Sequence, residues 1–210
     1  MSGEYLRVPE AIYARSFATI RAEADLSGVP ADLQDVIVRM VHASGMVDIV
    51  PDVRWGGEVV GEIEFALLES APVLCDCEMV RAGISRKYLP AGSELVVTLD
   101  DPNVPALAEK LETTRSAAAV ELWRGRLKGA VVVIGNAPTA LFHLLDLLDG
   151  GAAKPAAIIA TPVGFVGAAE SKARLAMRLD DVPFLTLLGR RGGSAIAAAA
   201  LNAILRNISA

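Results

Sequence analysis

Cysteine and histidine are scarce in this chain of 210 residues, which holds two of each. Cys75 and Cys77 are separated only by Asp76, and no second pair follows that would complete a zinc site. A His-Glu-x-x-His sequence is also missing. We therefore expect no metal ion and assign the cysteines no redox role. We interpret both as small buried residues at the end of a strand, where the spacing would turn them to the same face.

Aromatic residues and positive charge are in short supply too. Phe, Trp and Tyr make up 5% of the residues, and the formal net charge is −5. Proteins that bind single strands of nucleic acid stack the bases on aromatic rings, and nucleic-acid-binding domains carry an excess of Lys and Arg. The composition therefore argues against a nucleic-acid partner.

Long uncharged hydrophobic runs are absent, although 53% of the residues are hydrophobic. A helix needs about 20 apolar residues to span a membrane. The best candidate, Ala195–Ile204, is shorter and is interrupted by Asn202. The first residues lack the basic start and apolar stretch of a secretory signal. We expect a cytoplasmic protein with no membrane partner, whose apolar excess is buried in its core or against another subunit.

The common nucleotide and hydrolase fingerprints are missing as well. No Gly-x-Gly-x-x-Gly follows a predicted strand, and no Gly-x-x-x-x-Gly-Lys-Ser/Thr loop occurs. The Gly-x-Ser-x-Gly turn of hydrolases is also absent. These absences argue against a dinucleotide, a nucleoside triphosphate and a serine-hydrolase triad.

What the chain does contain is a regular succession of short apolar runs and helical patterns. The runs are short, mostly without alternation, and bounded by Gly, Pro or charge, which is typical of strands buried on both faces. They lie at 72–75, 95–98, 130–134, 156–160 and 183–187. Helical patterns alternate with them at 104–127, 139–148, 166–179 and 193–207, and weakly from Met79. This alternation predicts an α/β fold, a doubly wound, Rossmann-like parallel sheet in three layers with helices on both faces.

Helices are predicted before the first of these strands. The patterns indicate one helix over 9–26, a second from Pro30 to about Gly45, a turn at Trp55–Gly57 and a third helix over 58–70. We expect one domain over residues 1–210, with a helical part at 1–70 and a parallel-sheet part at 71–210.

Glycine-rich loops follow the last three predicted strands, at 135–139, 161–167 and 189–194. In a parallel sheet such loops meet at the carboxyl edge, where ligands bind. The helices that follow direct their free N–H groups to the same place. We therefore predict an anion site at this edge.

His42 is the leading candidate for proton transfer. Asp35, Arg39 and His42 are four and then three residues apart, so a helix places them on one face. Imidazole gives and takes protons near neutral pH. Two structural alternatives stand beside this: His42 could favour the negative end of a helix dipole, and Arg39 could be an exposed partner of Asp35.

The sequence resembles the precorrin-8X methylmutases of cobalamin biosynthesis over nearly its whole length. The resemblance is carried by seven motifs in order. They are Ala11–Phe17, Arg39–Ala43, Leu74–Val80, Thr114–Ala119, Ile134–Leu141, Pro162–Lys172 and Gly189–Ser194.

The resemblance implies an isomerase without a cofactor that moves a methyl group between adjacent ring-C carbons of precorrin-8X, giving hydrogenobyrinate. It implies a homodimer with sites near the subunit interface. It assigns proton transfer to His42, and substrate binding to Ser16 and Arg39. We extend the expected substrate-binding set to Arg115, Ser116, Asn136 and Gly192, because the substrate is an apolar macrocycle with many carboxylates that arginines and backbone N–H groups would hold. Val163, Phe165 and Val166 would form slot walls, and Arg15 would add a carboxylate contact.

Other interpretations stay open from the residues alone. Arg115 could be solvated, Asn136 could tie the backbone of its own loop, and His143 is interpreted as a packed or capping residue. As a whole, the chain could instead be a non-catalytic tetrapyrrole carrier, or a nucleotide-dependent enzyme with a degenerate loop.

Overall fold

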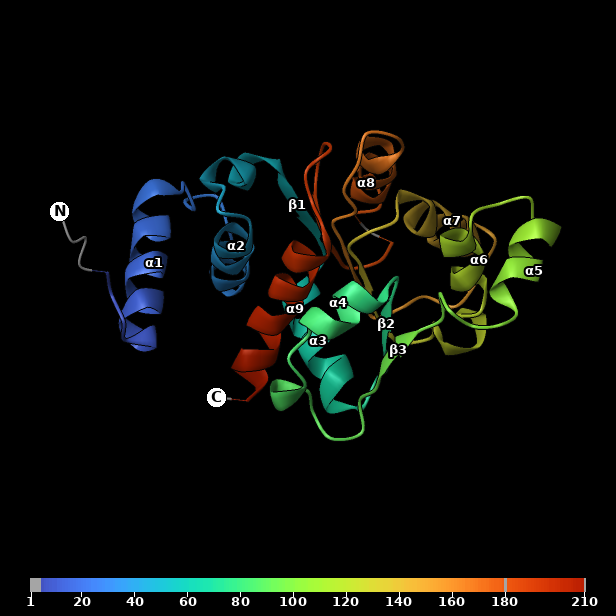
Figure 1. The fold of residues 1–210 in the computed structure, drawn as a ribbon, viewed down its shortest axis with the longest axis horizontal. Helices are drawn as coiled ribbons and strands as arrows, with labels where there is room; N and C mark the ends of the chain where they lie inside the picture. The colour runs from blue at the N-terminus through green and yellow to red at the C-terminus, as the bar shows by residue number, and fades with distance from the viewer. Residues whose placement is uncertain (1–4, 180, 210) are drawn as a thin grey trace.

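The fold, taken from a computed structural model that describes residues 5–179 and 181–209, consists of helices on both sides of a central sheet (Figure 1). The α-helices are α1 (Pro9–Glu23), α2 (Ala31–Ser44), α3 (Val59–Leu68), α4 (Glu78–Gly83), α5 (Val104–Lys110), α6 (Arg115–Glu121), α7 (Pro138–Asp149), α8 (Ala168–Ala176) and α9 (Ser194–Ile208). The 3-10 turns are η1 (Val47–Asp52), η2 (Arg86–Tyr88) and η3 (Arg124–Arg126). The strands are β1 (Val53–Gly56), β2 (Val73–Cys75), β3 (Leu95–Val97), β4 (Val131–Ile134), β5 (Ala157–Ala160) and β6 (Phe184–Leu187).

One sheet joins the strands of the described residues in the order β1-β6-β5-β4-β2-β3. Strands β2 to β6 run parallel, and β1 pairs antiparallel with β6 at one edge. The five predicted strands are confirmed within two residues at each end. The carboxyl ends of β4, β5 and β6 lie side by side, so the loops that follow them meet at one edge.

Two hydrophobic cores lie on opposite faces of the sheet, as the doubly wound fold predicts. Alternate residues of β4 show the division, because Val131 and Val133 face one core while Val132 and Ile134 face the other. Helices α3, α4 and α9 cover the first face, and α7 and α8 cover the second together with residues of α6. All four β4 side chains are fully buried, which contributes about 1.5–3 kcal/mol each to folding.

The first two helices lie outside these layers. Helix α2 packs along α9 with one apolar side, which buries Val36, Ile37 and Met40. Helix α1 packs on α2, and its buried residue is Ile20. Figure 1 shows α1 at one end of the molecule, with α2 between it and α9. Most of the surface of α1 is therefore open to solvent.

Two predictions about local structure are wrong. Trp55 lies in β1, opposite Leu185, and the turn predicted at Trp55–Gly57 begins two residues later, at Gly57 with φ +62°. The helix predicted over 104–127 is broken by Glu112, whose φ is +48°. Thr114 then starts α6 by accepting a hydrogen bond from the N–H of Ala117.

Across residues 5–179 and 181–209, no helix has the apolar length that crossing a bilayer requires.

Candidate active site between the two N-terminal helices

His42 lies in the last turn of α2, where the helix ends at Gly45. The N–H of Gly45 donates to the carbonyl oxygen of Val41, and its φ of +68° is the left-handed conformation that glycine adopts most readily. The imidazole is exposed rather than packed in the core. It therefore sits at the negative end of a helix, in a place that a ligand can reach.

A hydrogen bond from α1 fixes this imidazole. The Oγ atom of Ser16 lies 2.8 Å from Nδ1 of His42. A serine hydroxyl donates to the neutral ring nitrogen and accepts from the protonated one, so the contact persists in both protonation states. Because Nδ1 is occupied, Nε2 is the atom available for proton exchange.

Two aromatic rings from α1 also contact the imidazole. Phe17 meets it edge to face at 5.3 Å between ring centroids, and Tyr13 lies at 5.7 Å. Tyr13, Ser16 and Phe17 share one face of α1 because they are three and four residues apart. Arg39, one turn before His42 on α2, stacks over Phe17 at 5.0 Å. The structure thus brings three of the predicted site residues together: Ser16, Arg39 and His42.

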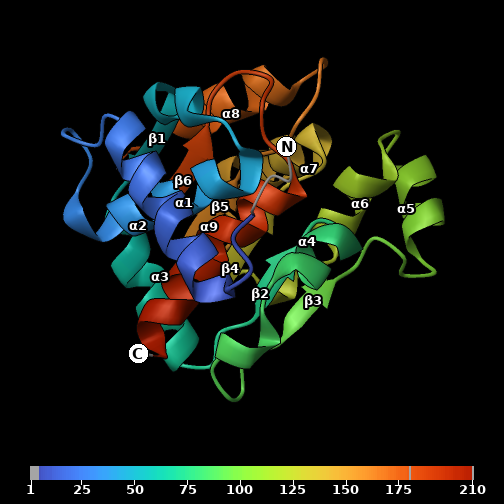
Figure 2. The same ribbon diagram turned by 60° about the vertical axis from the view of Figure 1, so that its left-hand side comes forward.

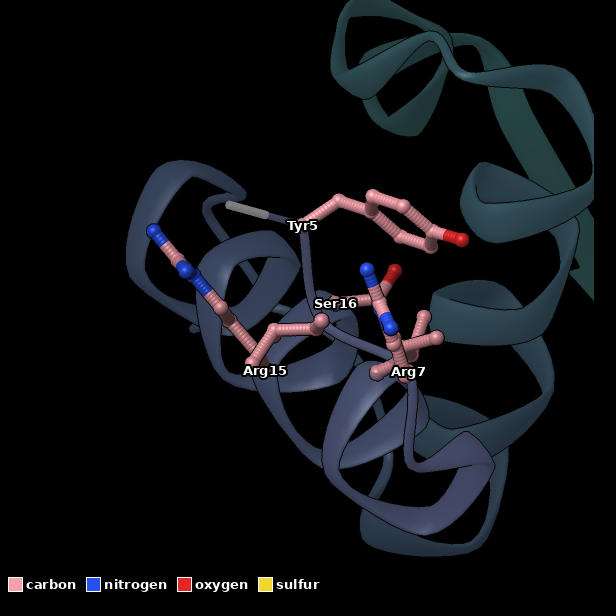
Figure 3. A pocket seen from close by; sticks show the side chains of 6 residues that line it. Tyr5, Arg7, Arg15 and Ser16 are labelled. Atoms are coloured by element: carbon pink, nitrogen blue, oxygen red, sulfur yellow. The ribbon is translucent and has the colours of Figure 1, made fainter. Parts of the chain in front are cut away.

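A large cavity opens on the other side of Ser16, next to residues 5–8, which precede α1 and form the N-terminal arm. It has a volume of about 970 Å³ and is lined by Tyr5, Leu6, Arg7, Ile12, Arg15 and Ser16. Figure 3 shows Tyr5, Arg7 and Ser16 gathered on one side, while the guanidinium of Arg15 extends away from them. Within the described part of the chain, no carboxylate forms an ion pair with Arg7 or Arg15. The cavity therefore offers cationic groups next to the hydroxyl that holds His42.

Four further predicted residues lie elsewhere, at the carboxyl edge of the sheet. Arg115 starts α6, is exposed, and pairs with Asp100 at 3.3 Å. Ser116 follows it and is half-buried, while Asn136 is exposed in the loop after β4. Gly192 packs so closely on the β5 loop that an added Cβ would overlap the carbonyl oxygen of Thr161.

The first group is Ser16, Arg39 and His42, and the second is the four carboxyl-edge residues. Within one chain, the members of the second group that α6 carries are far from the first group (Figure 1 and Figure 2). In Figures 1 and 2, α1 and α2 lie on one side of the molecule and α6 on the other, with α4 and α9 between them. The cavities next to His42 are lined by residues of the N-terminal arm, α1, α2, η1, η2 and α9, with no residue of the second group. A single chain does not bring His42 to Arg115.

The loop after β4 already holds an anion, the protein's own Asp76. This carboxylate is buried and accepts hydrogen bonds from the backbone N–H groups of Gly135 at 3.1 Å, Asn136 at 2.9 Å and Ala137 at 2.8 Å. Burial raises the pKa of Asp76, and the three N–H donors act in the opposite direction. The amides that we predicted for a ligand are occupied here, and Asp76, rather than the side chain of Asn136, ties the loop.

The loop after β6 is fixed in a similar way by Lys172 and Arg191. The Nζ of Lys172 is fully buried and donates to the carbonyl oxygen of Arg191 at 2.6 Å. Burial lowers the pKa of Lys172 to about 8. The guanidinium of Arg191 pairs with Asp48 at 2.6 Å and Asp52 at 2.8 Å in η1, the turn that follows α2. These contacts join the Gly192 loop to the segment after His42.

The remaining candidates have structural partners. His143 pairs with Glu121 at 2.8 Å, which agrees with a packed residue. Cys75 is in β2, whereas Cys77 lies beyond the strand, directly before α4; both are buried thiols without a disulfide. Among the residues that the structure describes, no cluster of His, Cys, Asp and Glu is arranged to hold a metal. Asp76 and Lys172 were not assigned from the sequence, although an Asp between two residues of a buried strand end was a usable signal.

Comparisons with known proteins agree on one family. A family model described as precorrin-8X methylmutase matches residues 11–207. A precorrin-8X methylmutase of Pseudomonas aeruginosa is 56% identical over 201 residues, which cover 96% of this chain and 97% of the relative. A cobalt-precorrin-8 methylmutase of Priestia megaterium is 34% identical over 197 residues, covering 93% of this chain and 87% of the relative.

The fold agrees with solved structures as well. The structure of a precorrin-8X methylmutase from Thermus thermophilus aligns with a TM-score of 0.85 at 34% identity, over 95% of this chain and 96% of that one. A structure titled precorrin-8X methylmutase related protein aligns with a TM-score of 0.83 at 30% identity, over 91% of this chain and 99% of the other.

Proposed function

This chain belongs to the precorrin-8X methylmutase family and is an isomerase of cobalamin biosynthesis, and we propose that His42 is the proton donor and acceptor of its reaction. The substrate is precorrin-8X, in which a methyl group moves between adjacent carbons of ring C to give hydrogenobyrinate. The observation that supports His42 most directly is its hydrogen bond with Ser16, which leaves Nε2 free.

The reaction needs only one proton, which the enzyme donates to the substrate and later takes back. Substrate and product are isomers, so no electrons are gained or lost overall. In this proposal, protonation of the macrocycle by His42 shifts the conjugated double bonds, and the methyl group migrates with its bonding electrons to the neighbouring carbon over one face. His42 then takes a proton back, which restores neutrality. A positioned acid of this kind contributes about 10²–10⁴ in rate.

The surroundings of His42 suit this task. The imidazole is held by one hydrogen bond and by the rings of Tyr13 and Phe17, so its position is set before the substrate arrives. The 970 Å³ cavity next to Ser16 lies at the upper end of the volumes that enclose ligands, which suits part of a macrocycle. Arg7, Arg15 and Arg39 provide guanidinium groups for its carboxylates.

We further propose a homodimer whose sites are shared between protomers. The support is the separation of the predicted residues: α1 and α2, which carry Ser16, Arg39 and His42, lie on one side of the molecule, and α6, which carries Arg115 and Ser116, lies on the other (Figures 1 and 2). The largely exposed surface of α1 is available to a second copy. In such a dimer, the partner's carboxyl-edge loops complete the site around His42, and the substrate contacts both chains.

Two further parts of the proposal concern the cellular compartment and the class of ligand. The free thiols of Cys75 and Cys77 support a reducing compartment, the cytoplasm. The net charge of −5 supports a small-molecule substrate over a nucleic acid.

The test is a comparison of turnover and binding in the His42→Ala variant. We expect conversion of precorrin-8X to fall by about 10²–10⁴ while hydrogenobyrinate still binds, as followed by its absorbance. A near-normal rate in this variant would remove His42 from the mechanism. A wild-type protein that binds precorrin-8X without converting it would be a carrier instead.

A further inference from the structure

Next to His42 lies a second, smaller recess that the proposed mechanism does not use. It is enclosed by α1, α2, α9 and the turn η2, and it has a volume of about 170 Å³. Its lining residues are Tyr13, Arg39, His42, Ala43, Ser85, Tyr88, Ala199, Asn202 and Arg206. Ligand sites for whole small molecules begin at about 300 Å³, so this recess fits one side chain of a ligand and not a macrocycle.

Two arginines from different helices face this recess. Arg39 comes from α2 and Arg206 from the last turn of α9, and the close packing of the two helices brings them together. The same pair lines a neighbouring hollow of about 180 Å³ between the two helices. Their guanidinium groups are therefore arranged around one place.

Neither arginine has a carboxylate partner among residues 5–179 and 181–209. Asp35, one helical turn before Arg39, pairs with Arg21 of α1 instead. Arg39 rests on the ring of Phe17 at 5.0 Å, and Arg206 rests on Tyr88 at 4.8 Å. Stacking on a ring orients a guanidinium while leaving its N–H groups free to donate.

The two positive charges also disfavour one another. Partial burial, followed by the charge of Arg206, lowers the pKa of Arg39, and the opposing effect of Asp35 is smaller. An anion bound between the two guanidinium groups would turn this repulsion into attraction on both sides.

One further polar side chain that lines the recess, that of Asn202, is already engaged. Asn202 accepts from the N–H of Ser85 at 2.7 Å and donates to the carbonyl oxygen of Gly83 at 2.8 Å. The groups left for a ligand are the two guanidinium groups, His42, and the hydroxyls of Tyr13, Ser85 and Tyr88. Such a set selects a carboxylate.

We infer that Arg206 is a substrate-binding residue, which together with Arg39 holds one carboxylate side chain of the macrocycle in the recess beside His42. This inference rests on the function proposed above. The carboxylate arm enters the recess while the ring stays outside it, so Arg206 contributes to holding the macrocycle and not to the proton transfer itself.

The experiment compares Arg206→Gln with Lys128→Gln, which removes the same charge from an exposed site where the described residues provide no ion pair. We expect R206Q to weaken hydrogenobyrinate binding and to raise KM for precorrin-8X, each by about tenfold or more, with kcat within about threefold of wild type. K128Q should match the wild type. R206K should recover part of the binding, because lysine keeps the charge but not the two-pronged contact.

A second ligand distinguishes the loss of a carboxylate contact in R206Q from a general change in the shape of the binding site. With a hydrogenobyrinate whose side-chain acids are all amidated, wild type and R206Q should bind equally. Tight hydrogenobyrinate binding by R206Q, in a series where R39Q weakens it, would overturn the role of Arg206 and leave the proposed function intact. A wild-type protein that neither binds nor converts precorrin-8X would overturn both.

Discussion

The hydroxyl of Ser16 and the Nδ1 atom of His42 are 2.8 Å apart, although the two residues are 26 positions apart in the sequence and belong to different helices. This contact makes α1 a support for the imidazole. The contact also suggests that Ser16 positions His42. The family resemblance implies a different role for Ser16, which is substrate binding. The two roles predict different kinetics.

Replacing Ser16 with Ala separates them. We expect kcat to fall by about tenfold or more with KM almost unchanged, because a ring freed at Nδ1 is less well placed for proton transfer. Steady-state rates on precorrin-8X measure this. A raised KM at an unchanged kcat would instead assign Ser16 to the substrate.

Mixing two inactive variants tests the shared site. His42→Ala and Arg115→Gln homodimers should each be nearly inactive. If one protomer supplies His42 and its partner supplies Arg115, a mixed dimer contains one site with both defects and one site with none. Random exchange of subunits then restores about a quarter of the wild-type activity. Activity that stays at the level of the separate variants would place both residues in the same protomer's site or remove Arg115 from it.

The buried amine of Lys172 predicts a dependence of stability on pH. Its pKa in the folded protein, about 8, is below the ordinary value of 10.5, so the unfolded chain binds more protons in that interval. Stability therefore rises as the pH increases from about 8 towards 10.5, and the cost of the buried charge is present in full below that window.

A comparison with Lys172→Met isolates this effect from the titration of other groups. From about pH 7.5 to 9.5, the free energy of unfolding of the wild type should gain about 2 kcal/mol relative to the variant, as measured by urea denaturation. If the free energies of unfolding of the two proteins changed in parallel with pH, the amine of Lys172 would be protonated in both the folded and the unfolded state over this range, which would contradict the prediction.

The sequence revealed the parallel strands because burial on both faces leaves a continuous apolar run, as in Val131–Ile134. It did not reveal β1, because its glycines resemble a turn and its pairing partner, Leu185, is distant in sequence. The break at Glu112 was also missed, since the apolar spacing continues across it.

The site was predictable to the extent that one helix carries it. Helical spacing placed Arg39 and His42 side by side, and the structure agrees. Contacts between helices depend on how they pack, which the spacing within a helix does not encode. One such contact is the pair of Asp35, the partner considered for Arg39, with Arg21 of α1. Another is the approach of Arg206 from α9 to Arg39, which the sequence did not predict.

Asp76 gives the fold a tethered counter-ion. Folds of this shape commonly use the amides after a central strand to capture phosphate groups, and here a covalently attached carboxylate reaches those amides first. A tethered carboxylate competes for these N–H groups at a very high effective concentration, so free nucleotides in the cell do not bind at this position.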